Sequence, residues 1–132
     1  MSNKFSKSKD LKFFNKSVVD DYRNFPASVQ DDGGYQMDLI QKGEKPFNFD
    51  PIPVIGPGAY ELRLDDEQNE YRVLYVAKMD DAIWVLHAFQ KTTRKISDKD
   101  ISLAKARYKE LLQIQAVNKK HEKRAKNTPA KK

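Results

Sequence analysis

The residues between Tyr71 and Ile96 include side chains of the types that can cleave RNA without a metal or a thiol. Attack of a 2′-hydroxyl on the neighbouring phosphate needs a proton acceptor, a proton donor for the leaving oxygen, and cations around the developing charge. Histidine titrates nearest neutrality, so His87 can act as acid or base. Arg72 and the upstream Arg63 suit bidentate phosphate contacts. These three residues are the predicted catalytic group, with no cofactor and no metal.

A second set of residues would hold the RNA rather than react with it. Its cations would contact backbone phosphates, and its aromatic ring would stack on a base. The set comprises Lys78, Phe89, Lys91, Arg94 and Lys95. No single residue among them is diagnostic, so the prediction depends on their convergence on one sheet face.

The same residues also have an ordinary structural interpretation. A lone histidine in an apolar strand is more often structural than catalytic. Arg63 and Arg72 can pair with carboxylates on neighbouring strands, namely Glu61, Asp65 or Glu70. The segment KTTRK can be a solvated loop. The sequence alone leaves both interpretations open.

Two apolar runs predict a β-hairpin at the centre of the fold. They are residues 73–76 and 83–86, joined by a turn at Asp80-Asp81. This turn pairs Arg72 with Phe89, Leu74 with His87, Val76 with Val85 and Lys78 with Ile83. Strand alternation then predicts a core face with Tyr71, Val73, Tyr75, Ala77, Trp84, Leu86 and Ala88. The opposite, mixed face carries Arg72, Lys78, His87 and Lys91.

A third strand, at residues 59–64, extends this hairpin into an antiparallel meander. A loop at Asp66–Asn69 would pair Arg63 with Arg72. Both arginines would then lie on the mixed face with His87, which is why the three residues are predicted to share a site.

The remaining elements flank this meander. They are a strand at 11–14, a helix capped by Ser17 and ended by Pro26, a helix from Pro26 to Gly43, a loop at 46–58, and a last helix capped by Ser97 and Asp100. Gly33-Gly34 in the second helix either permits close packing or breaks the helix. The sequence therefore predicts an α+β fold, with an antiparallel sheet of about four strands and two N-terminal helices and a C-terminal helix packed on one face.

Composition excludes several classes of protein. The 132 residues contain no cysteine, which excludes disulfide scaffolds, thiol catalysis and zinc–thiolate sites. No apolar run approaches the roughly 18 residues that a membrane span needs. The N-terminal residues lack the apolar core of a signal peptide. We therefore predict a cytoplasmic protein without a membrane partner.

The positive charge of the chain is concentrated at its C-terminal end. Residues 118–132 contain seven Lys/Arg and one acidic residue, Glu122, which accounts for the whole formal net charge of +6. Such an uneven distribution of positive charge favours an anionic partner, most commonly nucleic acid. We expect a flexible basic N-terminus at 1–10, a folded domain at 11–117, and a basic, disordered tail at 118–132.

Several blocks of the sequence resemble the HigB-like branch of the RelE toxin superfamily, which includes phage-derived proteins. They are GPGAYELRL, EYRVLYVAK, WVLHAFQKTTRKI and DISLAKARYKELL, with FNKSVVDDYRNFP and LIQKGEKP upstream. The similarity covers about residues 11–112. Thr92 stands where the family pattern often has a second lysine, and Gly33-Gly34 and the long basic tail also depart from the pattern.

The resemblance implies a RelE-like fold and a toxin of a type II toxin–antitoxin pair. Such a toxin cleaves mRNA, usually on the ribosome, and a helix-turn-helix antitoxin neutralises it. By block match, the site would contain Arg63, Arg72, His87 and Lys91, with Lys95 beside them. The alternative is a non-catalytic RNA- or protein-binding module that retains the RelE-like fold, because function must be argued from the site and not from the fold.

Overall fold

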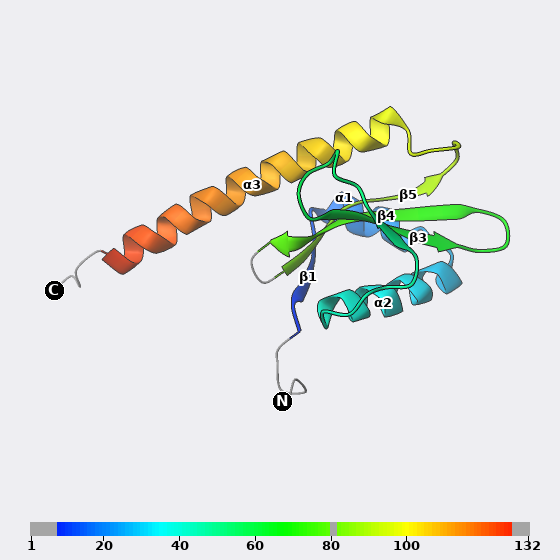
Figure 1. The fold of residues 1–132 in the computed structure, drawn as a ribbon, viewed down its shortest axis with the longest axis horizontal. Coiled ribbons are helices and arrows are strands. Elements are labelled where there is room, and N and C mark those ends of the chain that lie inside the picture. Colours follow the sequence, from blue (N-terminus) through cyan, green and yellow to red (C-terminus); the bar gives the residue numbers. More distant parts are fainter. Residues whose placement is uncertain (1–7, 80–81, 128–132) are drawn as a thin grey trace.

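The computed structural model describes residues 8–79 and 82–127, which form five strands and three helices (Figure 1). The strands are β1 (Asp10–Phe13), β2 (Phe49–Pro51), β3 (Ala59–Asp65), β4 (Glu70–Met79) and β5 (Ala82–Lys91). The helices are α1 (Lys16–Arg23), α2 (Ala27–Gln41) and α3 (Asp98–Asn127). The predicted order of elements is confirmed, with β2 added. The expected turn at Asp80-Asp81 and most of the expected flexible N-terminus lie outside the described residues.

The strands form one mixed sheet in the order β1-β5-β4-β3-β2. β1 runs parallel to β5, whereas the other neighbours are antiparallel. The expected sheet of about four antiparallel strands is therefore wrong in the direction of β1 and in the presence of β2. The sequence hides β2 because this short strand lies among prolines in the expected loop at 46–58. Pro51 is tolerated there because β2 is an edge strand that pairs only with β3.

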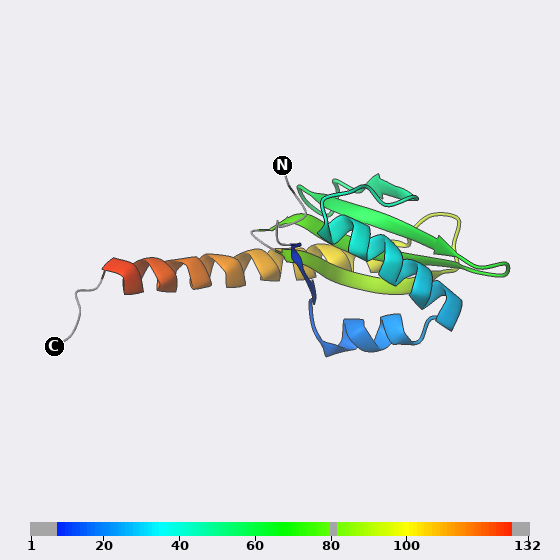
Figure 2. The same ribbon diagram turned by 90° about the horizontal axis from the view of Figure 1, so that it is seen from below.

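Helices cover both faces of the sheet, and the prediction that they share one face is wrong. Figure 1 shows α2 and α3 on opposite sides of the sheet, and Figure 2 shows α1 and α2 from below. α1 and α2 pack against Val73 and Tyr75, whereas α3 packs against Leu74 and Val76. All four of these β4 side chains are buried. A continuous apolar run of this kind is typical of a strand covered on both faces.

A β-bulge in β5 changes the predicted pairing in the middle of the hairpin. The pair Leu74–His87 is confirmed, whereas Val76 pairs with Trp84 and not with Val85. Leu86 is the extra residue at this irregularity, so it shares the α3 face with His87. Trp84 and Leu86 were predicted on the opposite face from His87, and the bulge is the reason that this prediction is wrong. A second irregularity restores the predicted register at Met79 and Ala82.

The two N-terminal helices form much as the sequence predicts. The N-cap of α1 lies two residues earlier than expected, at Asn15 and not at Ser17. The Asn15 side chain accepts a hydrogen bond from the backbone N–H of Val18 at 3.0 Å. α2 continues through Gly33-Gly34, and Gly33 faces the Tyr22 ring of α1 where a side chain would collide. Close packing is therefore the role of this glycine.

The last helix extends well beyond its expected end at Val117. α3 is helical to Asn127, so residues 118–127 are not the disordered tail that the sequence predicted. Among the described side chains of α3, the buried ones are Ala104, Tyr108 and Leu111, which pack on the sheet and all belong to its first half. The second half projects past the sheet, as Figure 1 and Figure 2 show.

Candidate active site

The central strands place the predicted catalytic residues on one face of the sheet. Arg63 pairs with Arg72 across β3 and β4, as predicted. Arg72 in turn pairs with Phe89 of β5, and His87 lies two residues before Phe89, on the same face of that strand. Paired residues share a face, so the two arginines and His87 all lie on the face that α3 partly covers.

Arg72 lies at the centre of a cluster of carboxylates. Its side chain is buried, with Nη2 at 2.8 Å from Glu70, Nε at 3.2 Å from Glu61 and Nη1 at 3.3 Å from Asp65. Nη1 also donates to the carbonyl oxygen of Tyr71 at 2.9 Å. The structural interpretation of this residue is thereby confirmed, because all three predicted carboxylates pair with Arg72. The three carboxylates thus more than balance its positive charge.

Arg63 pairs with a different carboxylate. Its guanidinium forms an ion pair with Asp50 of β2, and this hydrogen-bonded partner raises the pKa of Arg63. One third of the Arg63 side chain is exposed. The two arginines are therefore neighbours on the sheet but differ in surroundings: Arg72 is enclosed, whereas Arg63 reaches solvent.

His87 is held by the first turn of α3. Its Nε2 lies 2.7 Å from Oδ1 of Asp100, and Oδ2 of Asp100 accepts a hydrogen bond from the Ser97 hydroxyl at 2.8 Å. The Asp100 backbone N–H donates back to the same hydroxyl at 3.2 Å, so Ser97 caps the first turn of α3. Both carboxylate oxygens are thus engaged. The Asp100 side chain therefore fixes the orientation of the imidazole.

The other side of the imidazole has few polar contacts. The Phe89 ring stacks on it with 4.6 Å between ring centroids and an interplanar angle of 24°. Nδ1 of His87 is buried and makes no hydrogen bond within the described part of the chain. Because a carboxylate only accepts hydrogen bonds, Nε2 carries the proton and Nδ1 is the nitrogen that remains able to accept one.

A second contact from α3 stabilises the bulge beside His87. Nη1 of Arg107 donates to the carbonyl oxygen of Leu86 at 2.7 Å. Burial lowers the pKa of Arg107, and the carboxylate of Asp21 opposes that shift. The Arg107 guanidinium also lies 5.7 Å from the ring centroid of Phe14. Asp100 and Arg107 together attach α3 to the part of β5 that carries the histidine.

The predicted RNA-binding residues are only partly brought together. Lys91 lies on the same face as Arg72, where its Nζ donates to the carbonyl oxygen of Arg94 at 2.7 Å and lies 3.6 Å from Glu70. Arg94 and Lys95 are exposed in the segment that follows β5. The side chain of Lys78 lies outside the described part of the structure.

A hollow of ≈ 420 Å³ lies beside β5 where β1 no longer pairs with it. β1 pairs only with residues 82–85, so the following part of β5 has no strand neighbour on that side within the described residues. The hollow is lined by His87 and Phe89 together with Asn24, Phe25 and Tyr71. None of the predicted cationic residues lines this hollow in the described chain. The site is therefore a covered sheet face with a hollow at its edge.

Asp100 and Arg107 are site residues that the sequence analysis did not assign. The only available signal for Asp100 was its spacing from Ser97, which predicts a helix cap and says nothing about His87.

Within the described residues, no group of three or more His, Cys, Asp or Glu side chains is placed to hold a metal ion. None of the described helices is long and apolar enough to cross a membrane.

Residues 20–109 match the family of phage-derived Gp49-like proteins (DUF891). The chain belongs to this family. The Gp49-like proteins are a RelE-toxin-like family. No curated protein and no solved structure matched the chain in the corresponding comparisons.

The Gp49-like match includes the whole candidate site. It extends from α1 into α3 and so contains Arg63, Arg72, His87 and Asp100. β1 and the projecting half of α3 lie outside the matched residues. The part of the chain that is characteristic of Gp49-like proteins is therefore the helix-covered meander.

Proposed function

We propose that this chain is a toxin of a type II toxin–antitoxin system and that it cleaves mRNA as a metal-independent endoribonuclease. The observation that carries the proposal is the hydrogen-bonded pair of His87 and Asp100, on the sheet face that also carries Arg63 and Arg72. Membership of a RelE-toxin-like family supports the assignment.

In this proposal His87 transfers the proton. Asp100 keeps the imidazole proton on Nε2, so Nδ1 removes the proton of the ribose 2′-hydroxyl. The 2′-oxygen attacks the neighbouring phosphorus, and the bond from phosphorus to the 5′-oxygen of the next nucleotide breaks. The products are a 2′,3′-cyclic phosphate and a 5′-hydroxyl, whose oxygen takes a proton from water.

Phosphate binding requires an exchange of partners at Arg72. The Asp65 and Glu70 side chains are 53% exposed, whereas Glu61 is 17% exposed. A phosphate would therefore displace Asp65 and Glu70 and leave Glu61 in place. Lys91, close to Glu70, would then hold the RNA backbone. The His87 side chain is only 8% exposed, so RNA binding must also move the stacked Phe89 ring while Asp100 stays in place.

The experiment is primer extension on a reporter mRNA in a translating extract, with and without ribosomes. We expect His87→Gln to lower cleavage by about 10²-fold or more. His121→Gln is the matched control, because His121 is the other histidine of the chain and is exposed on α3. If the mRNA stays intact in the presence of the correctly folded wild-type chain, the proposed endoribonuclease activity is wrong. Cleavage that survives His87→Gln but is lost in Lys91→Ala would show that the wrong proton-transfer residue was assigned.

The partners of this toxin would be mRNA, the ribosome and a helix-turn-helix antitoxin, as in the HigB-like branch. Expression of the chain should arrest growth, and coexpression of a helix-turn-helix protein encoded beside it should restore growth. Arrest that depends on His87 and is relieved by such a neighbour would support the toxin. Normal growth at a verified level of folded protein would contradict it.

The second candidate function is a non-catalytic RNA- or protein-binding module. The observation that favours it is the pairing of Arg72 with three carboxylates, which leaves this cation no excess charge for a phosphate. A chain that binds RNA but leaves it intact in the primer-extension assay would identify this module.

A further inference from the structure

A polar hollow of ≈ 500 Å³ lies between α3 and the end of the sheet where β4 meets β5. Three parts of the chain line it: β1, the ends of the central hairpin, and the projecting half of α3. The lining is predominantly polar, with lysine, carboxylate and carboxamide side chains beside Trp84. Its volume falls within the range of about 300–1,000 Å³ that is usual for small-ligand sites.

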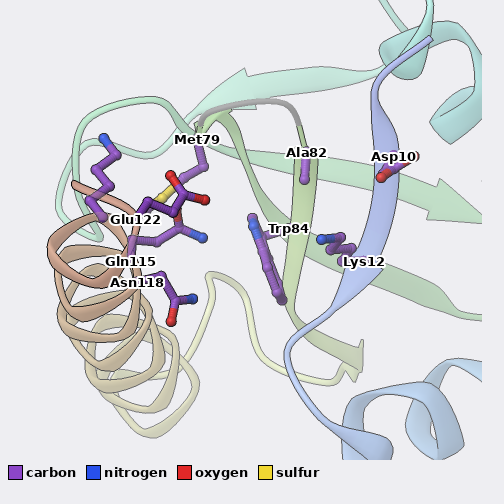
Figure 3. A pocket seen from close by; sticks show the side chains of 9 residues that line it. Asp10, Lys12, Met79, Ala82, Trp84, Gln115, Asn118 and Glu122 are labelled. Atoms are coloured by element: carbon purple, nitrogen blue, oxygen red, sulfur yellow. The ribbon is translucent and has the colours of Figure 1, made fainter. Parts of the chain in front are cut away.

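Trp84 forms one wall of this hollow. Lys12 of β1 is its strand partner and places its ammonium 5.5 Å from the centroid of the indole. Figure 3 shows the indole between Lys12 on one side and the side chains of α3 on the other. Lys12 covers one ring face and also lines the hollow, whereas the other ring face is turned toward the side chains of α3. Trp84 was predicted to be a core residue, but it is only half-buried.

The carboxamides of Gln115 and Asn118 form the opposite wall. These residues are neighbours on one side of α3, since three positions on a helix bring side chains together. Each carboxamide offers both a donor and an acceptor. An aromatic face opposite two carboxamides is an arrangement that suits a flat ligand with hydrogen-bonding groups along its edge.

The charges of the lining select a ligand without strong charge. Lys12 and Lys119 are balanced by Asp10 and Glu122 around the hollow. This balance gives little attraction for a polyphosphate or another highly charged anion. The polar lining is unsuited to a lipid chain, since carboxylates and carboxamides would lose their hydration there.

We propose that this hollow binds a single unpaired nucleobase, stacked on Trp84 and held at its edge by Gln115 and Asn118. Aromatic stacking accepts any base, whereas carboxamides recognise base edges through paired donor and acceptor contacts. The base can belong to a free nucleoside or to a single-stranded RNA. The site is separate from His87, which follows the bulge in β5 whereas Trp84 precedes it. The proposed base site requires only that the base binds, and it does not require the chain to cleave RNA.

Trp84 is the only tryptophan of the chain, so its fluorescence reports on the proposed site directly. The experiment titrates the full chain with adenosine, guanosine, cytidine and uridine, and separately with short single-stranded oligoribonucleotides. We expect saturable quenching by at least one nucleoside or oligonucleotide. Binding by nucleosides would identify a free-nucleoside site, and binding by oligonucleotides alone would identify a base of single-stranded RNA. No saturable quenching by any of these probes would overturn the proposal.

Two α3 variants test whether the carboxamides read the base. Gln115→Ala and Asn118→Ala should each weaken binding by about tenfold, the loss expected for edge contacts to a base. Gln113→Ala is the matched control, because Gln113 is an exposed carboxamide on α3 outside the lining. Alanine retains helix propensity, and circular dichroism checks the fold. Equal affinities in all three variants would overturn the assignment of the base to this hollow.

The binding experiment also separates this inference from the proposed cleavage. His87→Gln should lower cleavage by about 10²-fold or more and leave the quenching of Trp84 unchanged, since His87 does not line the hollow. Loss of quenching in the folded His87→Gln chain would place the ligand at the candidate active site and overturn the separate base site.

Discussion

At the scale of the residue, Arg72 has a structural role that can be measured independently of RNA. Replacing it with alanine leaves Glu61, a mostly buried carboxylate, without its cation, and we expect a loss of about 3–5 kcal/mol in unfolding free energy. Arg63→Ala is the matched control, because its ion pair with Asp50 is partly exposed and should contribute about 1 kcal/mol or less. Urea unfolding of the two variants measures both losses of unfolding free energy. Equal losses would contradict a special role for the enclosed Arg72 cluster.

A second residue, Tyr22, should make stability depend on alkaline pH. Burial, with the carboxylates of Asp32 and Asp31, raises the pKa of Tyr22 from 10.0 to about 12. Below pH 10 the phenol is neutral in both states. Above that pH the unfolded chain loses the proton first, so unfolding becomes more favourable until the folded phenol ionises near pH 12.

The expected loss from this residue is about 2–3 kcal/mol between pH 10 and pH 12. Tyr22→Phe should remove that part of the pH dependence. At neutral pH it should cost only about 0.5–1.5 kcal/mol, for the lost hydrogen bond to the Gln30 carbonyl oxygen. Chemical denaturation at several pH values measures both effects. An unchanged slope in Tyr22→Phe would contradict the raised pKa.

The sequence predicts residue types and faces better than it predicts partners. Strand alternation is sufficient to place Arg63, Arg72 and His87 on one face, because the meander keeps its predicted register at these positions. The contact between His87 and Asp100 depends on where α3 crosses the sheet. That crossing is decided by tertiary packing, and local spacing carries no signal for it.

At the scale of the element, the packing of α2 on α1 depends on one of two adjacent glycines. A Cβ at Gly33 would lie 2.5 Å from the Tyr22 hydroxyl and 3.0 Å from Leu64. The hydroxyl donates to the Gln30 carbonyl oxygen at 2.6 Å, so it cannot move without losing that bond. A Cβ at Gly34 would meet no atom within 4 Å. The two positions form a natural matched pair.

We expect Gly33→Ala to destabilise the fold by about 1–3 kcal/mol through overpacking. Gly34→Ala should stabilise it by about 0.5–1 kcal/mol, because alanine favours the helix and restricts the unfolded chain. Thermal and urea unfolding of the two variants test the opposite signs. Stabilisation of similar size at both positions would show that α2 does not pack closely on Tyr22.

The bulge in β5 is the element-scale feature that the sequence conceals. Residues 83–86 are all apolar, so a shift of one position exposes no polar side chain and leaves no break in the pattern. The bulge is recognisable only through its consequences. Trp84 and Leu86 join the α3 face, and Arg107 satisfies the carbonyl of Leu86.

At the scale of the whole molecule, the predicted α+β class is right but the predicted layering is wrong. The apolar run of β4 is long enough to be buried on both faces, yet alternation in the other strands suggested a single core face. The last helix also looked too polar to continue beyond Val117. It continues as a projecting helix, because helical hydrogen bonds do not require an apolar face at every turn.

The charged end of the chain should affect RNA binding far more than stability. Residues 123–132 carry five Lys/Arg and no acidic residue, so deleting them lowers the formal net charge from +6 to +1. The deletion keeps the lining of the proposed base site, including Glu122. It also keeps Leu111, the last buried residue of α3 in the core cluster.

We therefore expect the deletion to change unfolding free energy by less than about 1 kcal/mol, within the range of a surface change. Affinity for single-stranded RNA at low salt should fall by about tenfold or more, and the salt dependence should flatten, because fewer counterions are released. Leu111→Ala is the stability control and should cost about 2–5 kcal/mol. A deletion that destabilises as strongly as Leu111→Ala would show that the charged end packs on the domain. Unchanged RNA affinity and salt slope would show that RNA binds elsewhere.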